Sequence, residues 1–184
     1  RVAARELSGR VTAAMQRVFG DVCPPVLLAV PGYAQIDGER PESILPNEAH
    51  LFHEDEQKRR DRTWAAERPK RFLAAPVAVG TIDQALLGMV AVKHFFVRRF
   101  ALAGKVVVLD EVHSYDVYTG SLVTALVREL RLLGCTVIVL SATLTAARRR
   151  ELLAAVGAEE PAAAEAYPLV SITRDNHSVE HITL

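Results

Sequence analysis

Two apolar runs that each end in polar residues constrain the fold of this chain more than any other feature. Val106–Leu109 leads directly into Asp110, and Thr136–Leu140 leads directly into Ser141. The segment between the runs has the length and the apolar spacing of an amphipathic helix. Apolar strands that are separated by a helix and end in polar residues are typical of parallel sheets, which bind ligands at the carboxyl ends of their strands. The pattern therefore predicts an α/β fold with a mainly parallel sheet.

The residues at these two strand ends suit phosphate chemistry. Asp110 can hold Mg²⁺, directly or through water, beside the phosphates of a nucleotide. The adjacent Glu111 can orient or deprotonate an attacking water, and His113 can couple the phosphate site to a neighbouring element. The hydroxyls of Ser141 and Thr143 can hydrogen-bond back to Glu111 or His113. Taken separately, an Asp-Glu pair is often solvated surface and a Ser-Ala-Thr triplet is often a helix N-cap; together, in this order, they favour a catalytic site.

These segments, DEVH from Asp110 and SAT from Ser141, resemble motifs II and III of the DExH-box helicases of superfamily two. Further motifs lie upstream: VGTIDQ from Val79, then Val92-Lys93-His94 and Arg98-Arg99-Phe100. With them, residues from about 68 to 145 resemble the CRISPR-associated helicase-nuclease of type I systems. The resemblance implies a partial first RecA-like lobe with three α/β/α layers, which uses ATP and Mg²⁺ and moves along single-stranded DNA.

The resemblance also implies a set of nucleic-acid contacts upstream of the DEVH segment: Thr81, Gln84, Lys93, His94 and Arg98. Thr81 follows a predicted strand, and a hydroxyl beside the free amides of a helix start is a natural phosphate contact. Thr81 and Gln84 also have the spacing of a capping box, and both roles can hold at once. The basic residues between Arg59 and Arg71 fit a solvated helix face and a phosphate contact equally well.

The predicted lobe covers residues 1–173, with a loop-rich insertion at 31–60 and a tail or linker toward a second lobe at 174–184. Hydrophobic periodicity predicts helices at 2–19, 61–74, 82–96, 117–133 and 144–156. Short apolar runs predict strands at 26–30, 76–80, 106–109, 136–140 and 167–173. Arg148–Arg150 is expected on a solvated helix face, and 159–166 is expected to be a linker.

Composition sets limits on partners and compartment. The 22 Lys and Arg residues balance 22 Asp and Glu residues, so any nucleic-acid contact must come from local basic clusters. The two cysteines have no metal-ligand spacing, and no apolar run is long enough for a membrane span. These features predict a cytoplasmic protein without a membrane partner. His50 and His53 lie among acidic residues in a segment without rigid elements, which argues against a metal site there.

The Gly-x-x-x-x-Gly-Lys-Ser/Thr phosphate loop does not occur in the 184 residues. The resemblance implies that this loop precedes Arg1 in the parent protein, and that a second RecA-like lobe and a nuclease domain also lie outside the chain. Loss of a single transition-state arginine typically costs about 10³–10⁵ in rate. We therefore expect the chain alone to be inactive and the parent to be an ATP-dependent helicase, recruited to a Cascade-type CRISPR surveillance complex.

Three alternatives remain compatible with the sequence. The first is another DExH helicase, in repair or RNA metabolism, although VGTIDQ followed by VKH argues against it. The second is a non-catalytic remnant or binding module that keeps the lobe without the phosphate loop. The third is a plain structural fragment.

Overall fold

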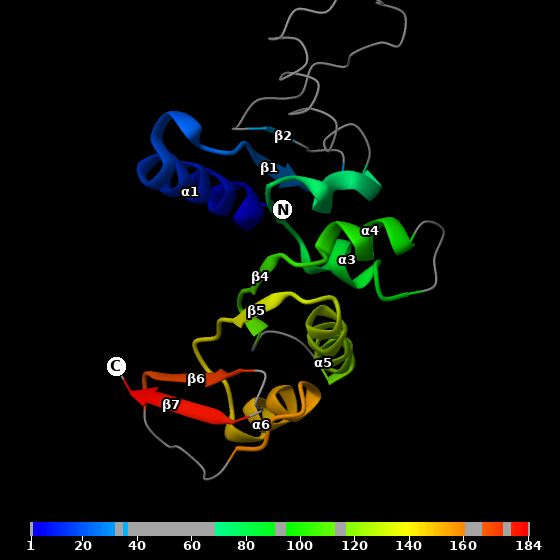
Figure 1. Ribbon diagram of the computed structural model, residues 1–184, viewed down its shortest axis with the longest axis vertical. Helices are drawn as coiled ribbons and strands as arrows, with labels where there is room; N and C mark the ends of the chain where they lie inside the picture. The colour runs from blue at the N-terminus through cyan, green and yellow to red at the C-terminus, as the bar shows by residue number, and fades with distance from the viewer. Residues whose placement is uncertain are drawn as a thin grey trace, which may run out of the picture. The chain divides into compact units, whose positions relative to one another are not determined.

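The computed structural model describes residues 2–31, 35–36, 69–90, 95–112, 117–160, 167–174 and 178–183. The chain divides into two compact units, Arg1–Leu102 and Ala103–Leu184. Each unit combines helices with one pair of parallel strands (Figure 1), which confirms the predicted α/β fold class. No helix in the described ranges is long and apolar enough to cross a membrane.

The described residues of the first unit form α-helices, short 3-10 helices and three strands. In chain order its elements are α1 (Val2–Phe19), η1 (Gly20–Val22), β1 (Val26–Ala29), β2 (Gln35–Ile36), η2 (Pro69–Ala74), β3 (Val77–Gly80), α3 (Ile82–Leu86) and α4 (Phe95–Leu102). The predicted helix at 2–19 and the predicted strands at 26–30 and 76–80 are thereby confirmed.

The sheet of the first unit has the strand order β2-β1-β3. β1 is parallel to β3, with Val26 opposite Val77, and antiparallel to β2. All four residues of β1 are buried, as expected for a strand with neighbours on both edges and with α1 packed against it. Leu27 and Ala29 form a core cluster with Phe72, which lies in η2, and with Ala75, which directly follows η2.

The parallel strands β1 and β3 approach closely at their carboxyl ends. A Cβ atom added to Gly80 would lie 2.8 Å from the backbone oxygen of Ala29 and 3.1 Å from its Cβ. Only glycine tolerates this approach. The glycine of the VGTIDQ segment therefore fixes where the chain leaves the sheet, one residue before Thr81.

The helix predicted at 82–96 is wrong in its extent. α3 ends at Leu86 and α4 begins at Phe95, so Arg98 and Arg99 lie in a second helix, beyond the end of the predicted one. Gly88 follows the end of α3 and weakens helix propensity. Its Cα also faces α4 closely, because an added Cβ would lie 3.3 Å from Cβ of Arg98.

The predicted basic helix at 61–74 is confirmed only as a helical segment at its end. Pro69–Ala74 is a 3-10 helix, and 61–68 lie outside the described residues. The insertion predicted at 31–60 also lies outside them, including His50 and His53, apart from Pro31 and the short strand β2.

The second unit begins with the strand that carries the DEVH segment. Its elements are β4 (Val106–Leu109), α5 (Val117–Leu132), β5 (Thr136–Val139), α6 (Ala146–Ala155), β6 (Leu169–Thr173) and β7 (Val179–Thr183). β4 and β5 are parallel, and Leu109 lies opposite Val139. The predicted strand-helix-strand unit is confirmed, and α5 supplies its buried core residues: Val123, Leu126, Val127 and Leu130.

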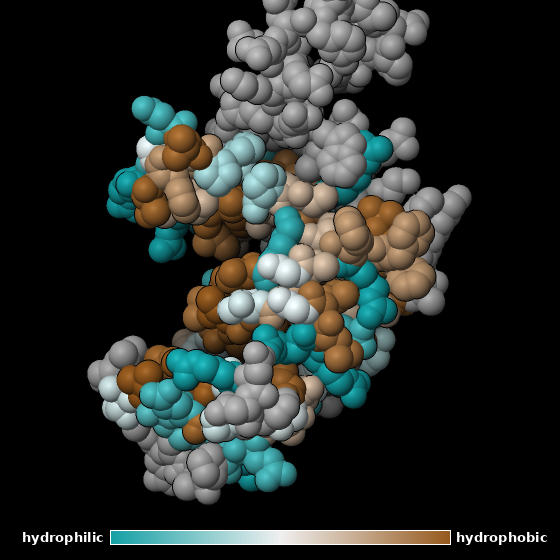
Figure 2. All heavy atoms as spheres, in the orientation of Figure 1, coloured by the Kyte–Doolittle hydropathy of each residue, from teal (hydrophilic) through white to brown (hydrophobic). Residues whose placement is uncertain are grey.

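The apolar sequences of β4 and β5 suggest strands that are buried on both faces. The structure differs, because one face of this strand pair is exposed. Val106 is 65 % exposed and Val108 is 53 % exposed, while Leu109 is buried. Val108 and Ile138 are register partners, so the exposed side chains share one face of the strand pair. Apolar residues gather on this surface in Figure 2. An exposed face of this kind is typical of a sheet that is covered by further structure in a larger protein.

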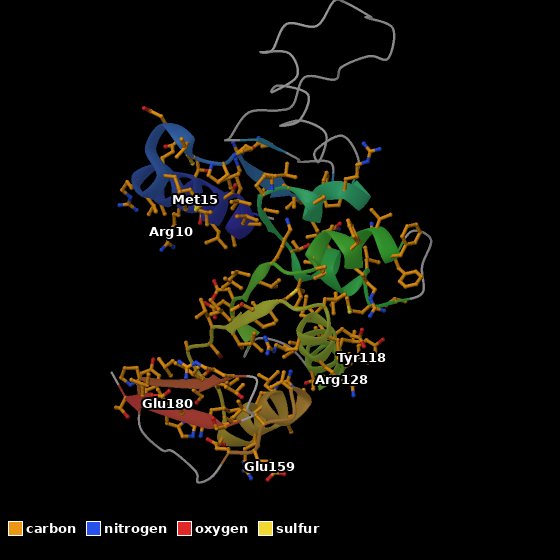
Figure 3. All side chains as sticks on the ribbon, viewed as in Figure 1. Arg10, Met15, Tyr118, Arg128, Glu159 and Glu180 are labelled. Carbon is orange, nitrogen blue, oxygen red and sulfur yellow. The ribbon has the colours of Figure 1, made fainter. Side chains whose placement is uncertain are left out.

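The end of α5 follows the expected pattern for a helix terminus. Gly134 has a φ of 73°, the left-handed conformation that the residue after a helix often adopts. Arg131 donates from Nη1 to the carbonyl oxygen of Cys135 at 2.9 Å, which ties the helix to the start of β5. Arg128 is exposed on the outer side of α5 (Figure 3).

Arg148 connects α6 to α5, and the prediction of a solvated face at 148–150 is wrong for this residue. Its Nη2 donates to the carbonyl oxygen of Gly120 at 2.6 Å, and its Nη1 donates to Oγ1 of Thr124 at 2.8 Å. Nη1 also lies 2.6 Å from Oε2 of Glu151. This hydrogen bond holds the pKa of the Glu151 carboxyl below its ordinary value, so its small stabilising effect is lost as the pH falls through that lowered pKa.

Replacing Arg148 with Ala is expected to lower the free energy of unfolding by about 1.5–3 kcal/mol, because hydrogen bonds to a charged group between two helices are lost. Arg150→Ala is the matched control. Arg150 is exposed and, among the described residues, donates to the carbonyl oxygen of Ala146 in its own helix, and we expect a change within about 0.5 kcal/mol. Urea denaturation measures both values, and equal values would contradict the tethering role of Arg148.

The end of the chain forms a hairpin, not the tail or linker that we expected at 174–184. β7 pairs antiparallel with β6, and Ser171 lies opposite His181 with Oγ 3.0 Å from Nδ1. Glu160, expected in a linker, has a side chain that is only 1 % exposed and lies 2.6 Å from Nη2 of Arg149. Nε2 of His181 lies 3.4 Å from the same carboxylate. These contacts join the hairpin to α6, and the pairing that creates β7 is not visible in the local sequence.

Candidate functional site

The loop that follows β4 places two carboxylates next to each other at the end of the strand. Asp110 and Glu111 are both exposed, directly after the buried Leu109. The backbone N–H of Glu111 donates to Oδ1 of Asp110 at 3.0 Å. Glu111 has a φ of 56°, in the left-handed region that L residues other than glycine rarely adopt. Backbone strain of this kind concentrates at functional sites.

The end of β5 lies beside this loop. The N–H of Leu140 donates to the carbonyl oxygen of Leu109 at 2.8 Å, and the N–H of Val112 donates to the carbonyl oxygen of Leu140 at 3.3 Å. These bonds extend the strand pairing past both strands. The loop that contains Asp110 and Glu111 therefore lies beside Leu140, the residue directly before Ser141. The parallel arrangement predicted this proximity of the two backbone segments.

Ser141 is half-buried and Thr143 is exposed. The helix N-cap in this region is Thr145, whose Oγ1 accepts a hydrogen bond from the N–H of Arg148 at 3.2 Å. The hydroxyls of Ser141 and Thr143 are therefore not needed to cap α6, and their predicted coupling role stays a prediction. His113 lies outside the described residues.

The nucleic-acid contacts predicted upstream belong to the first unit. Thr81 occupies the N-cap position of α3 with an extended backbone, φ −91° and ψ 151°. Its side chain makes no capping hydrogen bond in the described part of the chain, so the predicted capping box with Gln84 is wrong. The hydroxyl of Thr81 is half-buried at the strand end that Gly80 fixes, where a phosphate contact remains compatible with the structure.

Gln84 and Arg98 both carry a buried polar atom. Gln84 is only 5 % exposed, and its Oε1 has no hydrogen-bond partner among the described residues. Arg98 is half-buried on α4, and its Nε is likewise buried without a partner. Unpaired buried polar atoms cost stability and call for a specific explanation, and a ligand site is one. Lys93 and His94 lie outside the described residues.

The donor set at the end of β4 fits a magnesium ion that is shared with phosphate oxygens. Magnesium sites of this kind use one or two carboxylates, water and substrate phosphates rather than a complete set of protein ligands. Asp110 is exposed, and one of its oxygens is oriented by the backbone of Glu111. No group of three or more His, Cys, Asp or Glu residues that could hold a metal by itself occurs in the described ranges.

Parallel strands, a helical crossover and carboxylates at a strand end define the class of this chain as RecA-like α/β. No family model matches the chain. It is 57 % identical over 97 residues to the CRISPR-associated endonuclease/helicase Cas3 of Thermus thermophilus, and 34 % identical over 110 residues to the protein of the same name from Escherichia coli. The matches cover 53 % and 59 % of this chain but 10 % and 12 % of the relatives.

Solved structures give the same result. A crystal structure of T. fusca Cas3-ATP matches 66 % of this chain, and 14 % of its own chain, with a TM-score of 0.56 and 34 % identity. A CRISPR RNA-guided surveillance complex in a pre-nicking state contains a chain that matches 69 % of this chain, and 17 % of its own, with a TM-score of 0.55 and 37 % identity. The chain is similar to one segment of the Cas3 helicase-nucleases, and it spans about a tenth of the length of the curated relatives. The resemblance and the RecA-like fold are confirmed.

Proposed function

We propose that this chain is the part of an ATP-dependent single-stranded DNA helicase that holds the hydrolytic carboxylates, in a parent protein that acts in CRISPR interference. One observation carries the proposal: Asp110 and the strained Glu111 directly follow one parallel strand, and hydrogen bonds of the flanking Leu109 and Val112 join this loop to the end of the next strand. The similarity to proteins named endonuclease/helicase supports it. Nuclease activity belongs to another part of the parent.

Each residue has a distinct role in this proposal. When bound, Mg²⁺ supplies positive charge beside the phosphates of ATP. Asp110 would hold this Mg²⁺ through its carboxylate. Glu111 orients the attacking water and accepts its proton. His113 connects the phosphate site to its neighbours. Ser141 and Thr143 couple the presence or absence of the γ-phosphate to the DNA-binding elements.

The DNA contacts are assigned to the first unit: Thr81, Gln84, Lys93, His94 and Arg98. Oε1 of Gln84 and Nε of Arg98 are buried without a partner among the described residues, and a nucleic-acid group that hydrogen-bonds to them would satisfy both atoms. Thr81 is the direct contact that the described residues favour. Recruitment to a CRISPR surveillance complex is supported by the similar chain in the pre-nicking complex. A cytoplasmic location remains part of the proposal.

ATP hydrolysis by the complete parent protein tests this function. We expect single-stranded DNA to stimulate hydrolysis at least about tenfold more than single-stranded RNA of the same sequence, and the 184-residue chain alone to show negligible turnover because one missing transition-state arginine costs about 10³–10⁵. Stronger stimulation by RNA would favour another DExH helicase. DNA binding without any hydrolysis by the parent would favour the binding module that lacks a phosphate loop.

A further inference from the structure

The backbone of Glu111 is held in a conformation that it would not adopt by itself. Among the described residues, Glu111 is the one non-glycine residue with a positive φ, at 56°. A Cβ atom crowds the neighbouring carbonyl in this left-handed region, so such residues persist only where the surrounding structure fixes them. A residue that holds Glu111 in this conformation therefore also positions a carboxylate of the proposed hydrolytic site.

Backbone positions on either side of the Asp110-Glu111 pair are held by hydrogen bonds to Leu140. On one side, Asp110 follows the last register pair of the sheet and accepts the N–H of Glu111 with Oδ1 at 3.0 Å. On the other side, the N–H of Val112 donates to the carbonyl oxygen of Leu140 at 3.3 Å, and Leu140 itself is bonded to Leu109 at 2.8 Å. Asp110 and Glu111 are thus the two residues that join the fixed backbone positions Leu109 and Val112, and Glu111 is the one with the left-handed backbone.

Val112 differs from the carboxylates beside it in being buried. It is 3 % exposed, whereas Asp110 and Glu111 are exposed. The left-handed Glu111 directly precedes the buried Val112, so the path of the backbone at Glu111 sets where the valine side chain enters the interior. Burial of the valine side chain supplies a favourable free energy that offsets the strain.

We propose that Val112 is a positioning residue for ATP hydrolysis: its buried side chain and its bond to Leu140 hold Glu111 left-handed and so fix where the carboxylate points. This inference rests on the proposed function, because it assigns Glu111 to the hydrolysis step. It also gives the Ser141–Thr143 segment a mechanical connection to Glu111, since Leu140 directly precedes Ser141. A shift at the end of β5 moves Glu111 through the backbone, without requiring a contact from either hydroxyl.

The test uses the complete parent protein with Val112→Ala, Val112→Ile and the control Val127→Ala, and measures kcat, the KM for ATP and the thermal midpoint. Val127 is also buried but lies in α5. We expect Val112→Ala to lower kcat at least about tenfold with less than about threefold change in KM, because misplacement of a catalytic group affects the chemical step more than binding. Val112→Ile keeps a β-branched apolar side chain at the buried position and adds one methylene, and it is expected to retain kcat within about twofold.

The proposal is overturned if Val112→Ala lowers kcat no more than Val127→Ala does at a comparable thermal midpoint. Where Val112→Ala does not fold, Val112→Thr and Val127→Thr are compared in the same way, and equal kcat values overturn it. Glu111→Gln separates this inference from the proposed function. Wild-type turnover in Glu111→Gln removes the proposed function, whereas an inactive Glu111→Gln with a fully active Val112→Ala removes only the role of Val112.

Discussion

Glu111→Gln is expected to reduce ATP hydrolysis by the complete protein about 10²–10⁴-fold, which is the usual contribution of a general base. Gln has nearly the same shape as Glu and can occupy the same exposed, left-handed position, but it cannot accept a proton from water at neutral pH. The change therefore removes the chemistry and leaves the backbone of the DEVH segment in place. Single-turnover hydrolysis with saturating single-stranded DNA is the direct measurement.

Glu159→Gln is the matched control for this substitution. Glu159 follows α6 and is exposed (Figure 3), and the same charge is lost at a position without a proposed role. We expect turnover within about twofold of the wild type for this surface change. ATP binding should survive in Glu111→Gln, because Glu111 acts on water rather than on the nucleotide. Wild-type hydrolysis by Glu111→Gln, or equal loss in both variants, would refute the assignment.

The sequence predicts the strands β4 and β5 well because each is a local feature of the chain. Apolar runs of four or five residues form β4 and β5 as expected, and their parallel pairing follows from the helix between them. The proximity of the loop that begins at Asp110 to the end of β5 then follows from the strand topology alone. Neither propensity nor periodicity predicts the left-handed backbone of Glu111, because that conformation depends on Val112 being buried and bonded to Leu140.

Other errors also come from contacts that are distant in sequence. Three adjacent arginines after the SAT segment look like a solvated surface, but Arg148 reaches Gly120 across 28 residues and Arg149 pairs with the buried Glu160. The exposed valines of β4 show the opposite error. Their apolar sequence predicts burial on both faces, and the described sheet has only two strands in this unit.

Asp110→Asn is expected to lower ATP hydrolysis by the complete protein about 10²-fold or more, and to raise the Mg²⁺ concentration needed for half-maximal turnover about tenfold. The amide oxygen can still accept the N–H of Glu111, so the 3.0 Å bond that orders the loop is retained. What is lost is the negative charge that makes the position a ligand for a hard cation. Electrostatic contributions of this kind to a transition state are typically worth 10²–10³, or about 2.7–4 kcal/mol.

A magnesium titration of hydrolysis at saturating ATP measures both effects of Asp110→Asn, with Asp21→Asn as the control. Asp21 is exposed in η1 of the first unit and has no proposed role. Glu111→Gln provides the second comparison: it should lose turnover without a change in the magnesium midpoint, because its carboxylate acts on water. An unchanged midpoint in Asp110→Asn would contradict the metal role of Asp110. An equal shift in Asp110→Asn and Glu111→Gln would mean that the two carboxylates hold the cation jointly, since neither charge could then be assigned to the water alone.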